Sequence, residues 1–257
     1  LFSASDESES LPSSVDLSAS PYFPEIGDQM GIGSCYAWSS AYYQYTYEAN
    51  KLNNIPTTKD NAYSPAFVYN YRSSTTFSGG TCMDAYNFMM EHGCLRMGTM
   101  PYQSTNGASY IQESNYDTSL STDTDAMIDA LETRIVGHDA ITIPGTGTPI
   151  TSPDDASLNE LKGMLADGKV FSVRVQGFEK WRYANRKQYD ETTGTASNYI
   201  NEKGRSESVC YRAIAGSSGH ALTVVGYDDT VWTDINGNGT PEQGEYGAFK
   251  IANSWGT

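Results

Sequence analysis

Basic residues are scarce in this 257-residue chain, which has 16 Lys and Arg against 31 Asp and Glu and a formal net charge of −15. No Lys or Arg occurs before Lys51. Such a surface repels phosphate groups, which excludes nucleic acid as a main partner. The chain also has no apolar run near the roughly 18 residues that a membrane-spanning helix requires, so we expect no membrane partner either.

Nor does the chain have the composition of a disordered or collagen-like protein. With 24 Gly, 10 Pro and 38% hydrophobic residues, it can bury the core of one large domain or two small ones. Its 19 tyrosines and many polar, uncharged residues are typical of secreted proteins, so we expect a secreted or extracellular location. Residues 1–10 are acidic and rich in serine, which predicts a solvated linker.

The hydrophobic pattern changes from helical to strand-like along the chain. Helices are predicted over residues 34–49, 65–71, 83–91 and 158–166, and strands over 133–136, 141–143, 170–175, 221–227 and 246–252. This order predicts an α+β domain over 11–257, with a helical lobe over about 11–125 and a β-rich lobe over about 126–257. Residues 103–125 and 176–218 are polar and poorly patterned, and they are predicted to be long surface insertions.

Capping residues support three of these helices. Ser64 followed by Pro65 is typical of a helix start, and Gly93 is typical of a helix end. Ser157 is predicted as the N-cap of the last helix, with Glu160 at the matching position of a capping box.

Cys35 carries the strongest chemical signal. It stands in the first turn of a predicted helix, where the positive end of the helix dipole favours the nucleophilic thiolate. A nucleophilic thiolate needs a partner base, and the chain has three histidines. His92 and His138 stand in polar surroundings and are predicted to lie at the surface. His220 instead opens a strand that is too apolar to be exposed.

A third group should orient the base. Asn253 ends another apolar strand, and two adjacent strands would bring Asn253 and His220 side by side. The Asn253 side-chain oxygen could then accept a hydrogen bond from one ring nitrogen.

Three segments around these residues resemble the papain family of cysteine peptidases. They read Gln29-x5-Cys35-Tyr-Ala-Trp-Ser, Gly219-His220-Ala-x4-Gly-Tyr and Asn253-Ser-Trp-Gly, in the order that the family has. The resemblance implies a two-lobe fold, with an active-site cleft between a helical lobe and a β-barrel-like lobe. It also implies a cysteine endopeptidase that hydrolyses polypeptides through a Cys thioester, with a proteinaceous inhibitor or a pro-segment as a further partner.

The resemblance assigns a role to each matching residue. Cys35 is similar to the family's nucleophile and His220 to its acid/base, Asn253 would orient the imidazole, and Gln29 would contribute to an oxyanion hole. The implied substrate-binding residues are Gly79, Gly80, Gly219 and Trp255, of which Trp255 would also shield the His–Asn hydrogen bond from water.

The chain departs from the family pattern in several places. Cys35 and His220 are 185 residues apart, against about 130–150 in the family, because the two insertions lie between them. Ile32 and Ser78 stand where the plant enzymes have a disulfide, which favours a bacterial type. The family also continues into a further strand, so we expect the protein to extend past Thr257.

Three cysteines remain besides Cys35. Cys82 and Cys94 would lie about 18 Å apart at the two ends of a helix, too far for a disulfide. The alternatives are a disulfide between Cys82 and Cys210, or three free thiols.

A further motif lies outside the papain pattern. Residues 234–245 fit the twelve-residue calcium loop, with oxygen ligands expected at positions 1, 3, 5, 7, 9 and 12 and glycine at position 6. The alternative is a Gly- and Asn-rich hairpin tip between the strands of His220 and Asn253. We expect a structural calcium ion, with no cofactor for the chemistry, held by Asp234, Asn236, Asn238, Thr240, Glu242 and Glu245.

Two other functions are compatible with the same fold. One is a catalytically idle papain-like module that binds polypeptide or a partner protein, although Gln29, Cys35, His220 and Asn253 are all intact. The other is a transglutaminase-like acyltransferase with the same Cys–His logic, which the Gln29 and Asn-Ser-Trp contexts disfavour.

Overall fold

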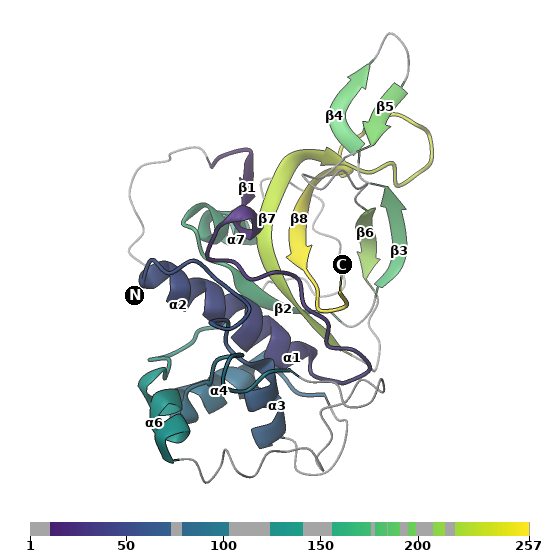
Figure 1. The fold of residues 1–257 in the computed structure, drawn as a ribbon. Helices are drawn as coiled ribbons and strands as arrows, with labels where there is room; N and C mark the ends of the chain where they lie inside the picture. Colours follow the sequence, from purple (N-terminus) through teal and green to yellow (C-terminus); the bar gives the residue numbers. More distant parts are fainter. Residues whose placement is uncertain are drawn as a thin grey trace.

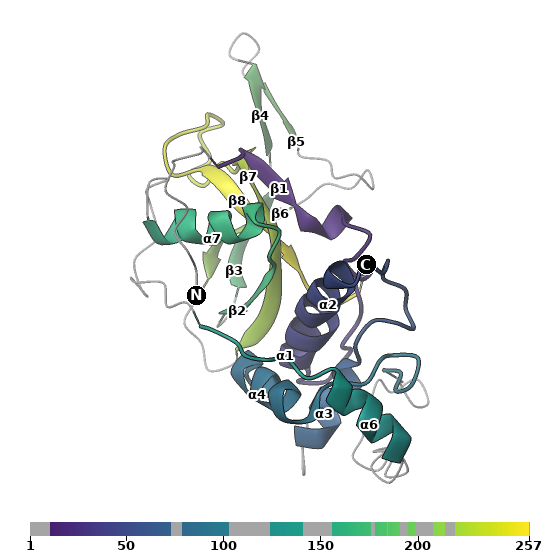
Figure 2. The ribbon, with the colours of Figure 1, turned by 90° about the vertical axis from the view of Figure 1, so that its left-hand side faces the viewer.

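Apart from α7, the α-helices lie in one part of the molecule and the strands in another (Figure 1). A sheet lies between two layers of helix, and α7 (Ala156–Ala166) covers the face opposite the main helical layer (Figure 2). The computed structural model describes residues 11–72, 79–102, 124–140, 156–175, 178–183, 185–190, 195–198, 208–213 and 219–256. The predicted linker 1–10, the predicted strand 141–143 and most of the insertion 103–125 lie outside these residues.

One long helix forms the centre of the helical part. It runs from Cys35 to Leu52 as α1 (Cys35–Ala37), η2 (Trp38–Tyr45) and α2 (Thr46–Leu52), and we call it the Cys35 helix. The predicted helix over 34–49 is thereby confirmed. Its middle is π-helical: the Thr46 N–H bonds to the Ala41 carbonyl five residues earlier. Such π-helical turns are frequent at functional sites.

Three further helices complete the helical part, and two of them have recognisable caps. In α4 the Thr81 hydroxyl accepts from the Asp84 N–H, and the Asp84 carboxylate accepts from the Thr81 N–H. Gly93 ends that helix at φ 71°, where a Cβ would overlap the Ala130 carbonyl. As predicted, Ser64 caps the helix that begins at Pro65, with its hydroxyl accepting from the Phe67 N–H at 3.3 Å. The three helices are α3 (Pro65–Arg72), α4 (Cys82–His92) and α6 (Thr124–Glu132).

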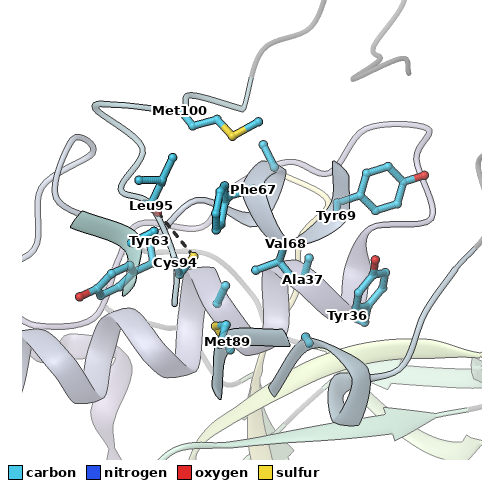
Figure 3. Packing of buried hydrophobic residues seen from close by; sticks show 14 of the residues in the cluster. Tyr36, Ala37, Tyr63, Phe67, Val68, Tyr69, Met89, Cys94, Leu95 and Met100 are labelled. Atoms are coloured by element: carbon cyan, nitrogen blue, oxygen red, sulfur yellow. Dashed lines mark hydrogen bonds between the residues drawn. The ribbon is translucent and has the colours of Figure 1, made fainter. Parts of the chain in front are cut away.

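Buried aromatic and aliphatic side chains hold this part together (Figure 3). Tyr36 and Ala37 of the Cys35 helix, Phe67 and Val68 of α3, and Met89 of α4 form one core with their neighbours. Each is at most 2% exposed. A fully buried side chain of this size contributes about 1.5–3 kcal/mol to folding, so this core fixes where the Cys35 helix lies.

Strand β7 (His220–Trp232) is the centre of the main sheet. Its residues alternate between two cores, as expected for a strand covered on both faces. Val225 packs with Trp38 and Tyr43 of the Cys35 helix, whereas Val224 packs with Leu165 of α7. The longest pairings of β7, all antiparallel, are with β1 (Ser14–Asp16), β2 (Phe171–Val175) and β8 (Tyr246–Ala252).

Two predictions about the region after residue 124 are wrong. The β-branched segment 133–136 does not form a strand, because it follows the end of α6 directly. The Thr133 hydroxyl accepts from the Cys94 N–H and donates within the same turn, and Val136 is fully exposed. Ser157 is not an N-cap, because α7 already begins at Ala156.

The described parts of the predicted insertion 176–218 contain four strands. Strands β3 and β6 form a separate two-stranded sheet, and β4 and β5 form a hairpin that joins the main sheet where Asn185 pairs with Trp232. Their mixed polar sequences lack the apolar alternation on which strand prediction depends. The strands are β3 (Phe178–Tyr183), β4 (Asn185–Asp190), β5 (Thr195–Asn198) and β6 (Ser208–Ala213).

Within the described residues, no helix combines the length and the hydropathy that crossing a lipid bilayer requires.

Candidate active site

The Cys35 thiol lies against the beginning of strand β7. Its Sγ accepts a hydrogen bond from the Ala221 N–H at 3.4 Å, and the residue is only 8% exposed. Ala221 follows His220 directly, so this contact brings the thiol to the residue next to the predicted base. Behind the thiol, the Ser34 and Tyr102 hydroxyls share a hydrogen bond at 2.8 Å.

The pairing of β7 with β8 brings His220 and Asn253 together. Thr223 pairs with Ala252, so the head of β7 and the end of β8 meet at one edge of the sheet. His220 Nε2 and Asn253 Oδ1 are 2.8 Å apart, and the Ser254 N–H donates to the same oxygen at 2.8 Å. That oxygen can only accept, so Nε2 carries a proton and Nδ1 is the nitrogen left for chemistry.

The surroundings of His220 favour the neutral imidazole. Burial lowers its pKa below the usual value, and the hydrogen bond to Asn253 offsets part of that effect. Trp255 stacks on the ring, with 4.7 Å between ring centroids and 21° between planes. Trp255 is itself 58% exposed, so it lies between the imidazole and solvent.

Gln29 is buried and held at both ends of its side-chain amide. Its Nε2 donates to the Ile32 carbonyl at 2.7 Å, and its Oε1 accepts from the Ser254 hydroxyl at 2.5 Å. Its backbone N–H also donates to the Ser254 carbonyl at 2.7 Å. An amide nitrogen carries two protons, so the bond to Ile32 leaves one N–H for a ligand.

The three glycines predicted to bind substrate lie at exposed or half-exposed positions. A Cβ on Gly79 would contact the Gly33 carbonyl at 3.8 Å, so Gly79 lies beside the loop that precedes Cys35. Gly80 follows it and leads into the Thr81 cap of α4. Gly219 is exposed, and a Cβ there would overlap the guanidinium of Arg174.

The other two histidines are partly exposed, as predicted. His138 Nε2 is 2.9 Å from Asn87 Oδ1, and His92 lies at the end of α4 beside Glu91.

Sequence reasoning missed a polar cluster that joins the Cys35 helix to the sheet. The buried Ser39 hydroxyl lies 2.8 Å from Ser172 Oγ, 2.8 Å from the Leu222 carbonyl and 2.9 Å from Thr223 Oγ1. Nearby, the Tyr43 hydroxyl donates to the Asn253 carbonyl at 2.7 Å. Ser39 ends the Cys35-Tyr-Ala-Trp-Ser motif and Ser40 follows it, but this local signal did not reveal the partners.

All four cysteines are free thiols, so the predicted alternative of a Cys82–Cys210 disulfide is wrong. Cys82 and Cys94 are shielded, and burial raises the pKa of both thiols above the usual value.

Residues 234–245 form a loop between β7 and β8 that is closed by its own side chains. Asp234 accepts from the N–H groups of Gly237, Asn238 and Gly239 at 2.6–3.1 Å. Glu245, only 7% exposed, accepts from the Ile235 N–H at 2.8 Å. Gly237, at position 6, has φ 82°, as a sharp turn there requires.

Glu242 lies over the middle of the same loop. It accepts from the side-chain amides of Asn236 and Asn238 at 2.9 and 2.6 Å, and the Thr240 N–H donates to Asn238 Oδ1 at 2.8 Å. The described residues contain no group of three or more His, Cys, Asp or Glu placed to hold a metal ion. Any ion at this loop would therefore depend on amide and carbonyl oxygens as well.

The fold is that of known cysteine proteases. Xylellain, a cysteine protease from Xylella fastidiosa, matches 96% of this chain and 76% of its own, with a TM-score of 0.52 and 18% identity. Digestive procathepsin L2 proteinase from Tenebrio molitor larval midgut matches 97% of this chain, with a TM-score of 0.50 and 19% identity. Digestive procathepsin L 3 from the same source matches with a TM-score of 0.50 and 17% identity.

These matches show that the chain has an α+β papain-like fold. The chain spans 60% and 62% of the lengths of the two procathepsins. No family model and no curated protein matches the sequence.

Proposed function

We propose that the chain is a papain-like cysteine endopeptidase that hydrolyses peptide bonds through a thioester on Cys35. One observation carries the proposal: the imidazole of His220 is bonded to Asn253, while the N–H of the next residue, Ala221, bonds the Cys35 sulfur. Nucleophile, base and orienting group thus occupy one place, although they come from three distant parts of the chain.

The proposed reaction follows from this arrangement. His220 Nδ1 takes the proton of the Cys35 thiol, and the thiolate attacks the scissile carbonyl carbon. As the C–N bond breaks and the thioester forms, Nδ1 gives that proton to the leaving amine. Water then attacks the thioester, and His220 takes a proton from it. The C–S bond breaks, the acid leaves, and the proton on His220 returns to the Cys35 sulfur.

The negative oxygen of each tetrahedral intermediate needs donors. The backbone N–H of Cys35 lies in the first turn of its helix, where N–H groups have no intrahelical acceptor. The second Nε2 proton of Gln29 is the other candidate. Donors of this kind lower the barrier by about 3–4 kcal/mol, and the hydrogen bonds of the Gln29 amide hold this donor in place.

Substitution of Cys35 tests the proposal. The Cys35→Ala variant should not cleave denatured protein above background, whereas Cys210→Ala, a matched loss of another thiol, should keep the parent rate. An epoxide peptide should add its mass to the tryptic fragment that contains Cys35. If Cys35→Ala cleaves as fast as the parent, the peptidase proposal is wrong, and a parent that binds peptides without cleaving them would be an idle binding module.

We also propose that the 234–245 loop binds a structural calcium ion. The support is the spacing of its oxygen groups, the turn at Gly237 and the position of the loop between β7 and β8, whose opposite ends carry His220 and Asn253. With only three carboxylates, binding should lie near 10⁻⁴–10⁻³ M, as in extracellular modules. An ion there would stabilise the hairpin without entering the reaction.

A thermal melt tests the calcium proposal. At about 10 mM calcium such a site should add about 1.4–2.7 kcal/mol, which raises the Tm by about 3–10 °C. Asp234→Ala should remove the shift, while Asp60→Ala, which removes an exposed acid elsewhere, should keep it. A parent without a shift, or an equal shift in Asp234→Ala, would refute the site.

Location and regulation complete the proposal. A calcium site of such weak affinity suits a secreted protein, and the procathepsins of the same fold are pro-forms, which supports a pro-segment or similar inhibitor as a partner. A bacterial type is also proposed, because Ile32 stands where the plant enzymes have a bridged cysteine.

A further inference from the structure

A basic side chain, that of Arg174, lies beside the proposed catalytic pair. Arg174 is on strand β2, where it pairs with Ala221, the residue that follows His220 and bonds the Cys35 sulfur. A Cβ built on Gly219, the residue before His220, would come within 2.6 Å of Arg174 Nη2 and 2.8 Å of its Cζ. The guanidinium therefore lies within one residue of the base.

The register of the sheet shows which way Arg174 points. Directly opposite residues of an antiparallel pair have their side chains on the same face, so Arg174 shares a face with Ala221. Ala221 packs in the same core as Cys35. Ser172, two residues before Arg174 and on the same face, bonds Ser39 of the Cys35 helix. Arg174 thus points to the side of the sheet that carries the nucleophile.

Exposure changes along this face. Ser172 is half-buried in contact with the helical part, whereas Arg174 is exposed. The contact between the helical part and the sheet consequently opens at Arg174, next to His220. A peptide bound beside His220 would therefore have this guanidinium within reach.

No acid of this chain balances that charge in the described residues. Lys162 pairs with Asp229 and Lys250 with Asp16, each at 2.6 Å, but Arg174 forms no ion pair with a described residue. This is notable in a chain with 31 acidic and 16 basic residues. A guanidinium offers a planar pair of donors that matches a carboxylate, and an exposed one is free to bind it from solution.

We propose that Arg174 binds a carboxylate of the substrate within about two residues of the scissile bond, and so gives the peptidase a preference for acidic peptides. This rests on the proposed function, because it places a peptide beside His220. Without Arg174, a protein of net charge −15 would repel acidic peptides. Arg174 therefore attracts acidic peptides that the rest of the surface repels.

Matched peptides test the proposal. Peptides blocked at both ends carry Glu or Gln at one of four positions around the cleaved bond, and the readout is the Glu/Gln ratio of kcat/KM. We expect a ratio of about ten at one position in the parent, a difference of about 1.4 kcal/mol. Arg174→Gln should bring the ratio to one or below. Arg134→Gln, which removes the same charge at an exposed site after α6, should keep it.

A binding measurement separates this proposal from the peptidase proposal. The Cys35→Ala variant, with and without Arg174→Gln, is titrated with the same fluorescent peptides, so no turnover is needed. If the parent cleaves no peptide, the peptidase proposal fails and the Glu/Gln ratio of Kd alone decides the role of Arg174. A ratio near one in both assays, or an equal ratio in Arg174→Gln, would overturn the role of Arg174 while the peptidase proposal stands on cleavage.

The source of the carboxylate is tested in the same series. Gln peptides with a free C-terminus are compared with their C-terminal amides. An Arg174-dependent preference confined to this pair would keep the carboxylate site but assign it to the C-terminal group of the substrate. A preference confined to the blocked Glu peptides would assign it to an acidic side chain.

Discussion

Replacing Asn253 with alanine removes the hydrogen bond between His220 Nε2 and Asn253 Oδ1, which is 2.8 Å long. Hydrogen bonds to groups that become charged contribute about 1.5–3 kcal/mol, and His220 becomes charged during the proposed reaction. If this contribution is lost from the transition state, kcat/KM should fall about 10- to 150-fold. The half-buried position of His220 places the expected loss nearer the lower limit.

The pH dependence gives a second and more specific readout. Burial lowers the pKa of His220, and the bond to Asn253 offsets part of this effect. Asn253→Ala removes the offset, so the imidazolium should lose its proton at lower pH. The alkaline limb of the kcat/KM profile should then move to lower pH, because the thiolate–imidazolium pair is the reactive form. Asn253→Asp keeps an acceptor and adds a negative charge, which should move the limb to higher pH.

Initial rates on one fluorogenic peptide, measured from pH 4 to 10, together with a thermal melt of each variant, complete the test. A drop in kcat/KM with an unmoved alkaline limb would mean that Asn253 supports only the local fold. A shift of the alkaline limb to lower pH in Asn253→Asp as well would refute the expected effect of the added negative charge.

Three further predictions concern neighbouring groups. Ser39→Ala leaves buried partners unsatisfied, so the free energy of unfolding should fall by about 1–3 kcal/mol and the Tm by about 2–12 °C. An unchanged thermal melt would contradict the role of this hydroxyl. At pH 7.5 iodoacetamide should alkylate Cys35 faster than Cys82 or Cys94, whose thiol pKa values burial raises; equal rates by mass spectrometry would count against it. Trp255→Ala should lower kcat/KM roughly 2- to 12-fold with little change in Tm, because the stacked ring is largely exposed.

Much of the fold could be predicted because its signals are local. The Cys35 helix follows from a run without Gly or Pro and with aromatic residues at helical spacing. Its π-helical middle could not be predicted, since a shift from i−4 to i−5 bonding leaves composition and periodicity almost unchanged. The four strands within 176–218 were missed for a related reason: their residues do not alternate between apolar and polar.

The candidate site likewise contains residues that local motifs predict and residues that they do not. Short motifs around Cys35, His220 and Asn253 identified the residues, and the structure brings His220 and Asn253 into contact. Ser39 ends the motif around Cys35, but that motif does not reveal its partners, and Arg174 belongs to no motif. The relation of Arg174 to Ala221 exists only through the register of two strands that are far apart in the sequence, so no local pattern could reveal it.

The contact between Cys35 and Ala221 has a consequence for the order of folding. Its partners are 186 residues apart, and the Ser39 contacts to the same strand span 183 and 184 residues. Contacts of such sequence separation form late, because the loop entropy must be overcome first. A half-folded chain therefore carries a thiol with no base beside it. If the chain is a peptidase, as proposed, its activity would begin only when the sheet has docked on the Cys35 helix, and newly made chains would not cleave one another while they are still unfolded.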